Sequence, residues 1–197
     1  MRQSILFAVL AALLSTTPAS AGPMTAGERQ RLLAHFEMTG AWLESELAGL
    51  SKAQLTFKMT PESWSVMEVV EHLAIAEPQY WKDFQHSLGK PVQPDFKPQA
   101  TDAAMLWYGI DRTNRATTGE ARVPRGTYAT VTDSFAAFRK LRAEMVQFAK
   151  TTEADLRGRQ YLTASQDLYQ WLLMISTHSQ RHVLQIREIK ADKGFPK

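Results

Sequence analysis

The most informative absence in this sequence is cysteine, which does not occur anywhere in its 197 residues. Without cysteine the chain has no disulfide, no thiolate metal ligand and no thiol nucleophile. Its stability must therefore come from packing. The chain is long enough for this, because one domain of this size buries about 70% of the surface that its unfolded form exposes.

Excess charge of one sign is also lacking. The chain carries 23 Lys and Arg residues against 20 Asp and Glu residues, a formal net charge of +3. This balance argues against nucleic acid or a membrane surface as the partner. Two recurrent signatures of catalysis are missing as well, namely a glycine-rich phosphate loop and the Gly-x-Ser-x-Gly motif of serine hydrolases. The sequence favours an unknown small-molecule substrate over a macromolecular one.

The N-terminus has the features of a secretory signal peptide. A short basic start containing Arg2 precedes an apolar run over residues 5–14, and Ala19-Ser20-Ala21 forms an Ala-x-Ala cleavage site. The apolar run is too short to span a membrane. We therefore expect residues 1–21 to be removed, leaving a single domain of residues 22–197 that is exported to the periplasm or secreted, without membrane insertion.

The mature chain shows helical rather than strand periodicity, with almost no period-2 alternation. Ser65 with Glu68, and Thr163 with Gln166, predict capping boxes at two helix starts. Pro78 predicts a bend or a break in the second helix. The pattern indicates an all-α four-helix bundle with a long crossover connection and one short extra helix. The expected helices cover approximately residues 28–47, 65–88, 102–115, 130–150 and 163–190.

Histidines supply the candidate chemistry. His178 and His182 are four residues apart, so they project from one helix face and can share a metal ion. A third ligand must come from another helix. His86 lies about 21 Å along a straight helix from His72, so these two cannot share a site. Periodicity by itself does not decide between His35 and His72.

Two motifs together resemble those of the DinB-like family of four-helix bundles. They are Trp64-Ser65-Val66 leading to Glu71-His72-Leu73, and His178-x-x-Arg181-His182-x-x-Gln185. The resemblance implies that His72, His178 and His182 converge on one divalent metal ion inside the bundle. The resemblance suggests zinc or nickel, with iron as a third option. Imidazole ligands by themselves do not select among these metals.

Two other kinds of metal site are excluded because the sequence lacks their motifs. A di-iron carboxylate site needs Glu three residues before its ligand histidines, and Val69, Ile175 and Ser179 stand at those positions. Ser179 also occupies the place where a metalloprotease His-Glu-x-x-His motif requires glutamate. The three imidazoles that the family resemblance implies would leave at least one coordination position of the metal open.

The weak candidates for a catalytic role are Glu68 and Arg181. Glu68 lies one turn before His72, where it could act on metal-bound water, but helix capping through Ser65 is the favoured interpretation. Arg181 could bind an anionic substrate, and structural pairing is favoured. Glu71 points away from His72 and is expected at the surface. Gln185 is placed to support His182.

The resulting expectation is an exported metal-binding protein that acts as a metal-dependent transferase or hydrolase. Thiol-dependent transferases of the family need small thiols that are kept in the cytosol, which fits an exported chain poorly. The alternative is a non-catalytic metal-binding or stress-related interaction bundle of the cell envelope. We leave formation of a homodimer open.

Overall fold

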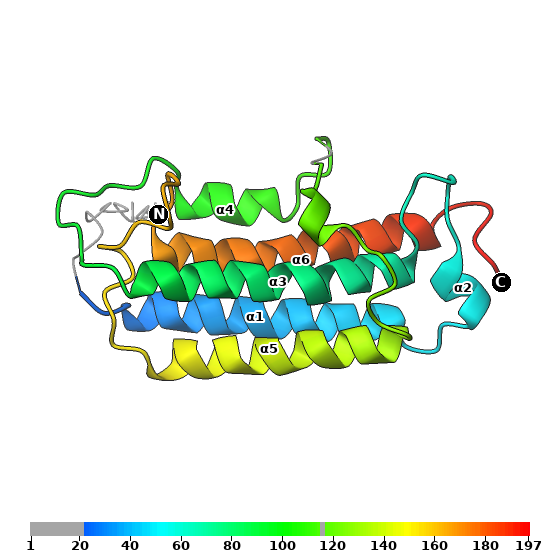
Figure 1. Cartoon of the computed structure of the whole chain (residues 1–197), viewed down its shortest axis with the longest axis horizontal. Helices are drawn as coiled ribbons and strands as arrows, with labels where there is room; N and C mark the ends of the chain where they lie inside the picture. Colours follow the sequence, from blue (N-terminus) through cyan, green and yellow to red (C-terminus); the bar gives the residue numbers. More distant parts are fainter. Residues whose placement is uncertain (1–21, 115–116) are drawn as a thin grey trace, which may run out of the picture.

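The computed structural model describes residues 22–114 and 117–197, so the expected signal peptide over residues 1–21 lies outside the described residues. Four long helices run side by side as a bundle (Figure 1). These are α1 (Ala26–Leu47), α3 (Val66–Leu88), α5 (Val131–Thr151) and α6 (Leu168–Lys190). The described residues form no named strand, so the prediction of an all-α bundle is confirmed.

The chain direction gives the bundle an up-down-down-up order, with α1 parallel to α6 and α3 parallel to α5 (Figure 1). α6 packs against both α1 and α3, and α5 packs against the same two helices from the other side. The long crossover joins α3 to α5 and contains α4 (Asp102–Tyr108), which lies on α6, and the 3₁₀ helix η1 (Glu120–Arg122), which contacts α3. α6 is consequently covered on most of its circumference.

Two smaller elements differ from the sequence prediction. A five-residue helix, α2 (Lys52–Thr56), lies between the first two expected helices, where the sequence predicts no helix. α4 ends at Tyr108 instead of near residue 115. Gly109 follows it at a close approach to α6, where an added Cβ would lie 2.6 Å from Oε1 of Gln180.

Local hydrogen bonds explain where the helices begin. The Ser65 side chain accepts a hydrogen bond from the Glu68 N–H while the Glu68 carboxylate accepts one from the Ser65 N–H, which confirms that capping box. The box predicted at Thr163 is wrong. α6 begins four residues later, where Asp167 and Gln170 form the capping box. Asp167 is fully buried, a tertiary feature that sequence spacing does not report.

The predicted break at Pro78 does not occur, because α3 continues through it to Leu88. Pro78 is exposed, so its ring displaces no neighbouring helix. Glu77 and Trp81 are buried on either side of it. Their burial holds both halves of the helix in the bundle. This outweighs the cost of an interior proline, about 3 kcal/mol, which comes from the lost backbone hydrogen bond and the clash of its ring.

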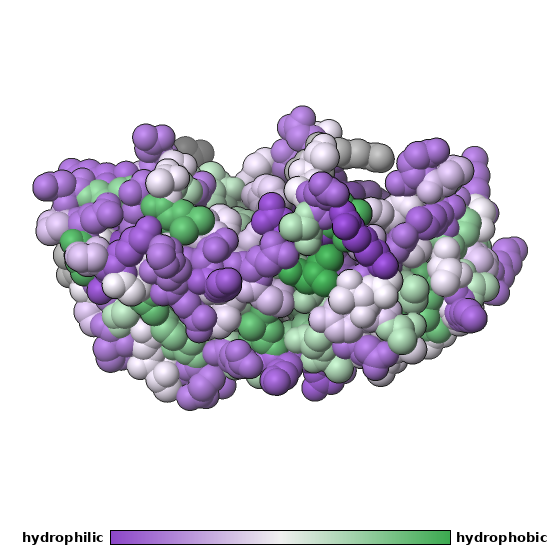
Figure 2. Space-filling view, viewed as in Figure 1, coloured by the Kyte–Doolittle hydropathy of each residue, from purple (hydrophilic) through white to green (hydrophobic). Residues whose placement is uncertain are grey.

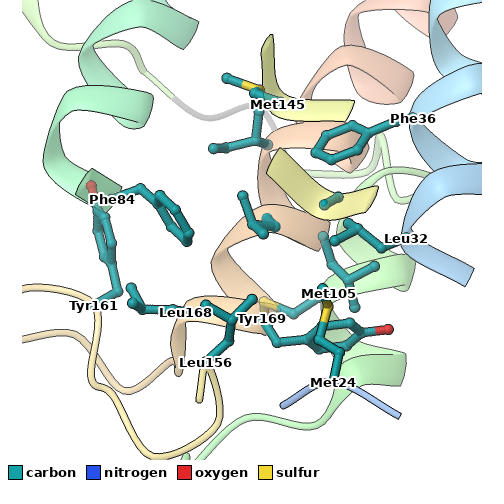
Figure 3. Close-up of a cluster of buried hydrophobic side chains, with 14 of the residues drawn as sticks. Met24, Leu32, Phe36, Phe84, Met105, Met145, Leu156, Tyr161, Leu168 and Tyr169 are labelled. Atoms are coloured by element: carbon teal, nitrogen blue, oxygen red, sulfur yellow. The ribbon is translucent and has the colours of Figure 1, made fainter. Parts of the chain in front are cut away.

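Two apolar clusters form the core, one toward each end of the bundle. The larger is built around Phe36, Phe84, Met145 and Tyr169 (Figure 3). The smaller cluster contains Leu43, Val66, Val69, Val70, Leu73, Phe138, Val183, Ile186 and Ile189. Between them all four long helices contribute buried polar side chains. This central polar layer is where unusual chemistry can be expected, because buried polar groups are costly unless they are paired.

The face of the molecule shown in Figure 2 is mainly hydrophilic, with smaller apolar areas between the polar residues. In the part of the chain that the structure describes, the most exposed large apolar side chains are Trp107 and Ile110, which are 62% and 50% exposed. Within residues 22–114 and 117–197, no helix combines the length and the apolar character that crossing a bilayer requires.

Candidate metal centre

The structure brings His72, His178 and His182 together from two helices. His72 lies in the second turn of α3, and the other two lie one turn apart near the middle of α6. Nε2 of His178 is 3.2 Å from Nε2 of His72 and 3.2 Å from Nε2 of His182. All three residues are at least 90% buried. Three imidazole nitrogens therefore face one another in the bundle interior.

Hydrogen bonds to the outer ring nitrogens set the tautomers of two of these histidines. Nδ1 of His72 is 2.7 Å from the carbonyl oxygen of Arg122, which can only accept, so this Nδ1 carries the proton. Nδ1 of His182 is 2.8 Å from Oε1 of Gln185, which confirms the supporting place predicted for Gln185. With the protons on Nδ1, the inward Nε2 atoms of both residues present lone pairs, as in metal sites with supported histidine ligands.

Burial keeps the group neutral. It lowers the pKa of His72, although the hydrogen bond to Arg122 partly offsets the effect. Burial, followed by the proximity of His182 and His72, lowers the pKa of His178 well below its ordinary value. Burial and the nearby His72 lower the pKa of His182 to about 3. All three rings are thus in the neutral form that metal binding requires.

The arrangement fits one divalent metal ion. Two nitrogens that each lie about 2.0–2.1 Å from a tetrahedral ion are roughly 3.3 Å apart. The two Nε2 pairs at 3.2 Å match that spacing. Without an ion, the Nε2 lone pairs of His72 and His182 would both face Nε2 of His178, which has at most one proton to donate to them. Among the described residues, this histidine group is the only set of three or more potential ligand side chains close enough to share one ion.

Aromatic rings enclose the three histidines. The Trp64 ring lies 4.9 Å from that of His72 and stacks on His182 at 6.3 Å. The Tyr80 ring meets His178 edge-on at 5.3 Å. Trp171 packs against Tyr80. These ring contacts pack against the imidazoles and hold their orientation.

His35, the other sequence candidate for a third ligand, belongs to a different network. Its Nδ1 lies 2.7 Å from Oγ of Ser176. It reaches α6 from α1, whereas the inward nitrogens of His178 and His182 face His72 on α3. His86 is exposed near the end of α3. Neither residue belongs to the three-histidine group.

Glu68 and Arg181, the two candidate catalytic residues, are engaged elsewhere. Glu68 caps α3 and forms an ion pair with Lys58 at 2.8 Å. Arg181 is buried and donates to the main-chain carbonyls of Tyr108, Asp111 and Asn114. It therefore fastens the crossover to α6. The favoured structural interpretation of both residues agrees with these contacts.

The prediction that Glu71 lies at the surface is wrong. It is only 2% exposed, and its carboxylate accepts hydrogen bonds from the backbone N–H groups of Arg125, Gly126 and Thr127 at 3.0, 3.2 and 2.7 Å. Gly126 has φ +73°, which helps successive N–H groups to point toward one anion. This carboxylate holds the crossover against α3, three residues beyond the carbonyl that binds His72.

Replacing Glu71 by alanine is therefore expected to loosen the crossover over the histidines. Three N–H groups would lose a charged acceptor, a cost of about 1–3 kcal/mol in the free energy of unfolding. We expect hydrogen exchange of the Arg125, Gly126 and Thr127 amides to accelerate at least tenfold, and metal affinity to fall because His72 loses a fixed partner. Unchanged exchange at these amides would contradict this role, and Glu62→Ala, at an exposed position, is the control.

The lowered histidine pKa values also predict a pH dependence for the metal-free protein. An unfolded histidine titrates near 6.5, so below that pH the unfolded chain binds protons that the folded His178 and His182 do not. Stability is full above pH 6.5 and falls as the pH drops toward 3. Each histidine contributes a slope of up to about 1.4 kcal/mol per pH unit. Urea unfolding at pH 7.5, 6 and 5 should show the fall in the free energy of unfolding. The dependence on pH should be weaker in His182→Gln.

The molecule is thus a four-helix bundle with a buried three-histidine group and a long crossover. A family model for the DinB superfamily matches residues 35–186, a span that includes all three histidines, and the chain belongs to that superfamily. The family predicted from the sequence motifs is confirmed.

A solved structure shares the fold. YfiT from Bacillus subtilis is described as a probable metal-dependent hydrolase with an unusual four-helix bundle topology. It superimposes with a TM-score of 0.59 at 19% sequence identity, over 88% of this chain and 91% of the YfiT chain. No curated protein matches the sequence significantly.

Proposed function

We propose that this protein binds one divalent metal ion through Nε2 of His72, His178 and His182 and uses it to hydrolyse a small molecule. The observation that carries the proposal is the convergence of three neutral imidazoles whose inward nitrogens are spaced as ligands of one ion. The description of YfiT as a probable metal-dependent hydrolase supports the reaction class. Zinc and nickel are the first choices for the ion and iron the third.

The bound metal would supply a Lewis acid and lower the pKa of a coordinated water toward neutrality. The protein's own residues hold and shield that position. Arg122 and Gln185 hold the protons of His72 and His182 on Nδ1, and Trp64 and Tyr80 keep bulk water away. Hydrolysis is preferred to thiol transfer because the chain has no cysteine and is proposed to be exported.

One observation favours a second candidate, a metal-binding bundle without catalysis. The three glutamates of α3 nearest the histidines are all engaged, Glu68 as a cap, Glu71 by backbone N–H groups and Glu77 by an arginine. Among the described residues, none of these carboxylates is left to act as a general base. Catalysis would then rest on the metal alone.

The deciding experiment compares metal-free protein with zinc, nickel and iron forms against a panel of small esters, amides and lactones. Metal content is measured first in protein purified from its native compartment. Hydrolysis that requires metal and disappears in His182→Ala supports the enzyme. Metal binding without turnover of any substrate favours the non-catalytic candidate.

Export is proposed on the sequence of residues 1–21 alone. Fractionation followed by intact-mass analysis would test it. A mature species beginning at Gly22 in the periplasm or medium agrees with the proposal, and a cytosolic species that retains Met1 contradicts it.

A further inference from the structure

Arg122 is a cation without a counter-ion beside the three-histidine group. Its guanidinium carbon lies 5.2 Å from the centre of the Tyr80 ring, and Tyr80 in turn contacts His178. Its main-chain carbonyl accepts the Nδ1 proton of His72. The same residue therefore touches the surroundings of two histidines, one through its backbone and the other across a tyrosine.

The guanidinium of Arg122 lacks the partners that other shielded arginines have. Its Nε is buried and has no hydrogen-bond partner, and no carboxylate of the described residues lies within ion-pair distance. By contrast, Arg142 is paired with Glu77 at 2.8 Å, and Arg157 with Glu28 and Asp102 at 2.7 Å each. The buried Nε of Arg122 has lost its water without gaining an acceptor, and a buried donor left unpaired is costly. An anion bound beside Nε would supply the missing acceptor.

The crossover backbone approaches the Arg122 guanidinium closely at Gly119. Gly119 lies next to Nη2, where an added Cβ would be 3.3 Å away. A side chain at position 119 would therefore crowd this nitrogen, and glycine avoids that contact. Nε and Nη2 form the edge of a guanidinium that binds two oxygens of a carboxylate or phosphate in parallel.

We propose that Arg122 binds an oxyanion group, a carboxylate or a phosphate, of the small molecule that reaches the three histidines. This inference rests on the proposed function and adds a substrate class to it, namely small acids or phosphorylated compounds. The Arg122 guanidinium would orient the anionic end through Nε and Nη2, while the rest of the molecule extends past Tyr80 toward the histidines.

The test uses acetate and inorganic phosphate as probes on full-length mature protein at fixed ionic strength. Cobalt(II)-loaded protein reports binding through its visible absorption, and metal-free protein through its tryptophan fluorescence, to which Trp64 and Trp171 beside the histidines contribute. We expect Arg122→Gln to weaken binding of the preferred probe at least about tenfold, the loss of a charge-assisted pair of hydrogen bonds. Arg122→Lys should keep part of the affinity, since a point charge remains. Whichever probe binds more tightly identifies the oxyanion.

Arg139→Gln is the matched control, because it removes the same charge from an exposed position on α5. It should leave anion binding unchanged. Cobalt affinity should also stay within about twofold in Arg122→Gln, since His72 bonds to the carbonyl and not to the side chain.

Two results would overturn the inference: anion binding that is equal in wild type and Arg122→Gln, or no binding of either probe in either metal state. If cobalt fails to bind the wild type, the metal proposal fails on its own. The metal-free titrations then decide the role of Arg122 by the same comparison of variants.

Discussion

Replacing any one of His72, His178 and His182 by alanine is expected to abolish tight metal binding. Each supplies one of three inward nitrogens, and two imidazoles hold an ion far more weakly than three. Losing a partner that only supports a ligand typically costs 10–100-fold in affinity. Losing a ligand should therefore cost more than about 100-fold, measured by calorimetric titration of the metal-free protein with zinc and nickel.

The same variants should lose the metal-dependent rise in melting temperature. A ligand at 100 times its dissociation constant stabilises the native state by about 2.7 kcal/mol. His86→Ala and His35→Ala should keep the full rise, because His86 is exposed and His35 bonds to Ser176. A His72→Ala protein that still binds zinc tightly and still gains stability would show that the three histidines do not act as one site.

Breaking the buried ion pair of the central polar layer is expected to produce the largest loss of stability. Both oxygens of the Glu77 carboxylate lie 2.8 Å from Nη2 of Arg142, and the side chains are 0% and 7% exposed. Nη1 of Arg142 donates to Thr39, and Nη2 also donates to Ser179 on α6. The network thus connects all four long helices. Glu77→Ala leaves a buried, unpaired guanidinium, which costs about 3–5 kcal/mol.

Chemical unfolding measures this loss directly. In a chain of this size each kcal/mol shifts the melting temperature by about 2–4 °C, so a drop of roughly 10 °C or more is expected. Glu77→Leu combined with Arg142→Met should recover most of it, because well-packed apolar residues can replace a buried pair. The exposed pair Arg139–Glu44 is the control, and Glu44→Ala should cost less than about 1 kcal/mol. An equal cost at the two pairs would contradict the role assigned to the buried pair.

The sequence by itself determined the existence of the four long helices and the pairing of His178 with His182. Both depend on interactions within a few residues. A spacing of four places two side chains on one helix face whatever the rest of the chain does, and Ser65 with Glu68 satisfies the first N–H groups of α3 locally. The family motif then pointed to His72, a choice that periodicity could not make.

Burial around Pro78 and Asp167 depended on tertiary packing. A proline in a helical pattern usually interrupts it, and α3 remains continuous because buried neighbours hold both of its halves. Thr163 had the spacing of a capping box, but α6 begins at a buried aspartate that Arg157 also contacts. A local sequence pattern predicts neither the burial of a residue nor a contact with a partner ten positions away, as between Arg157 and Asp167.

The surroundings of the histidines were decided by the crossover. Glu71 looked solvent-facing because its direction on α3 diverges from that of His72, yet the backbone of residues 125–127 covers it. Arg122 and Arg181 acquire their places in the same way, one by giving a carbonyl to His72 and the other by binding three carbonyls. Main-chain groups are identical at every position, so contacts made through them leave no mark on the sequence and only the folded chain reveals them.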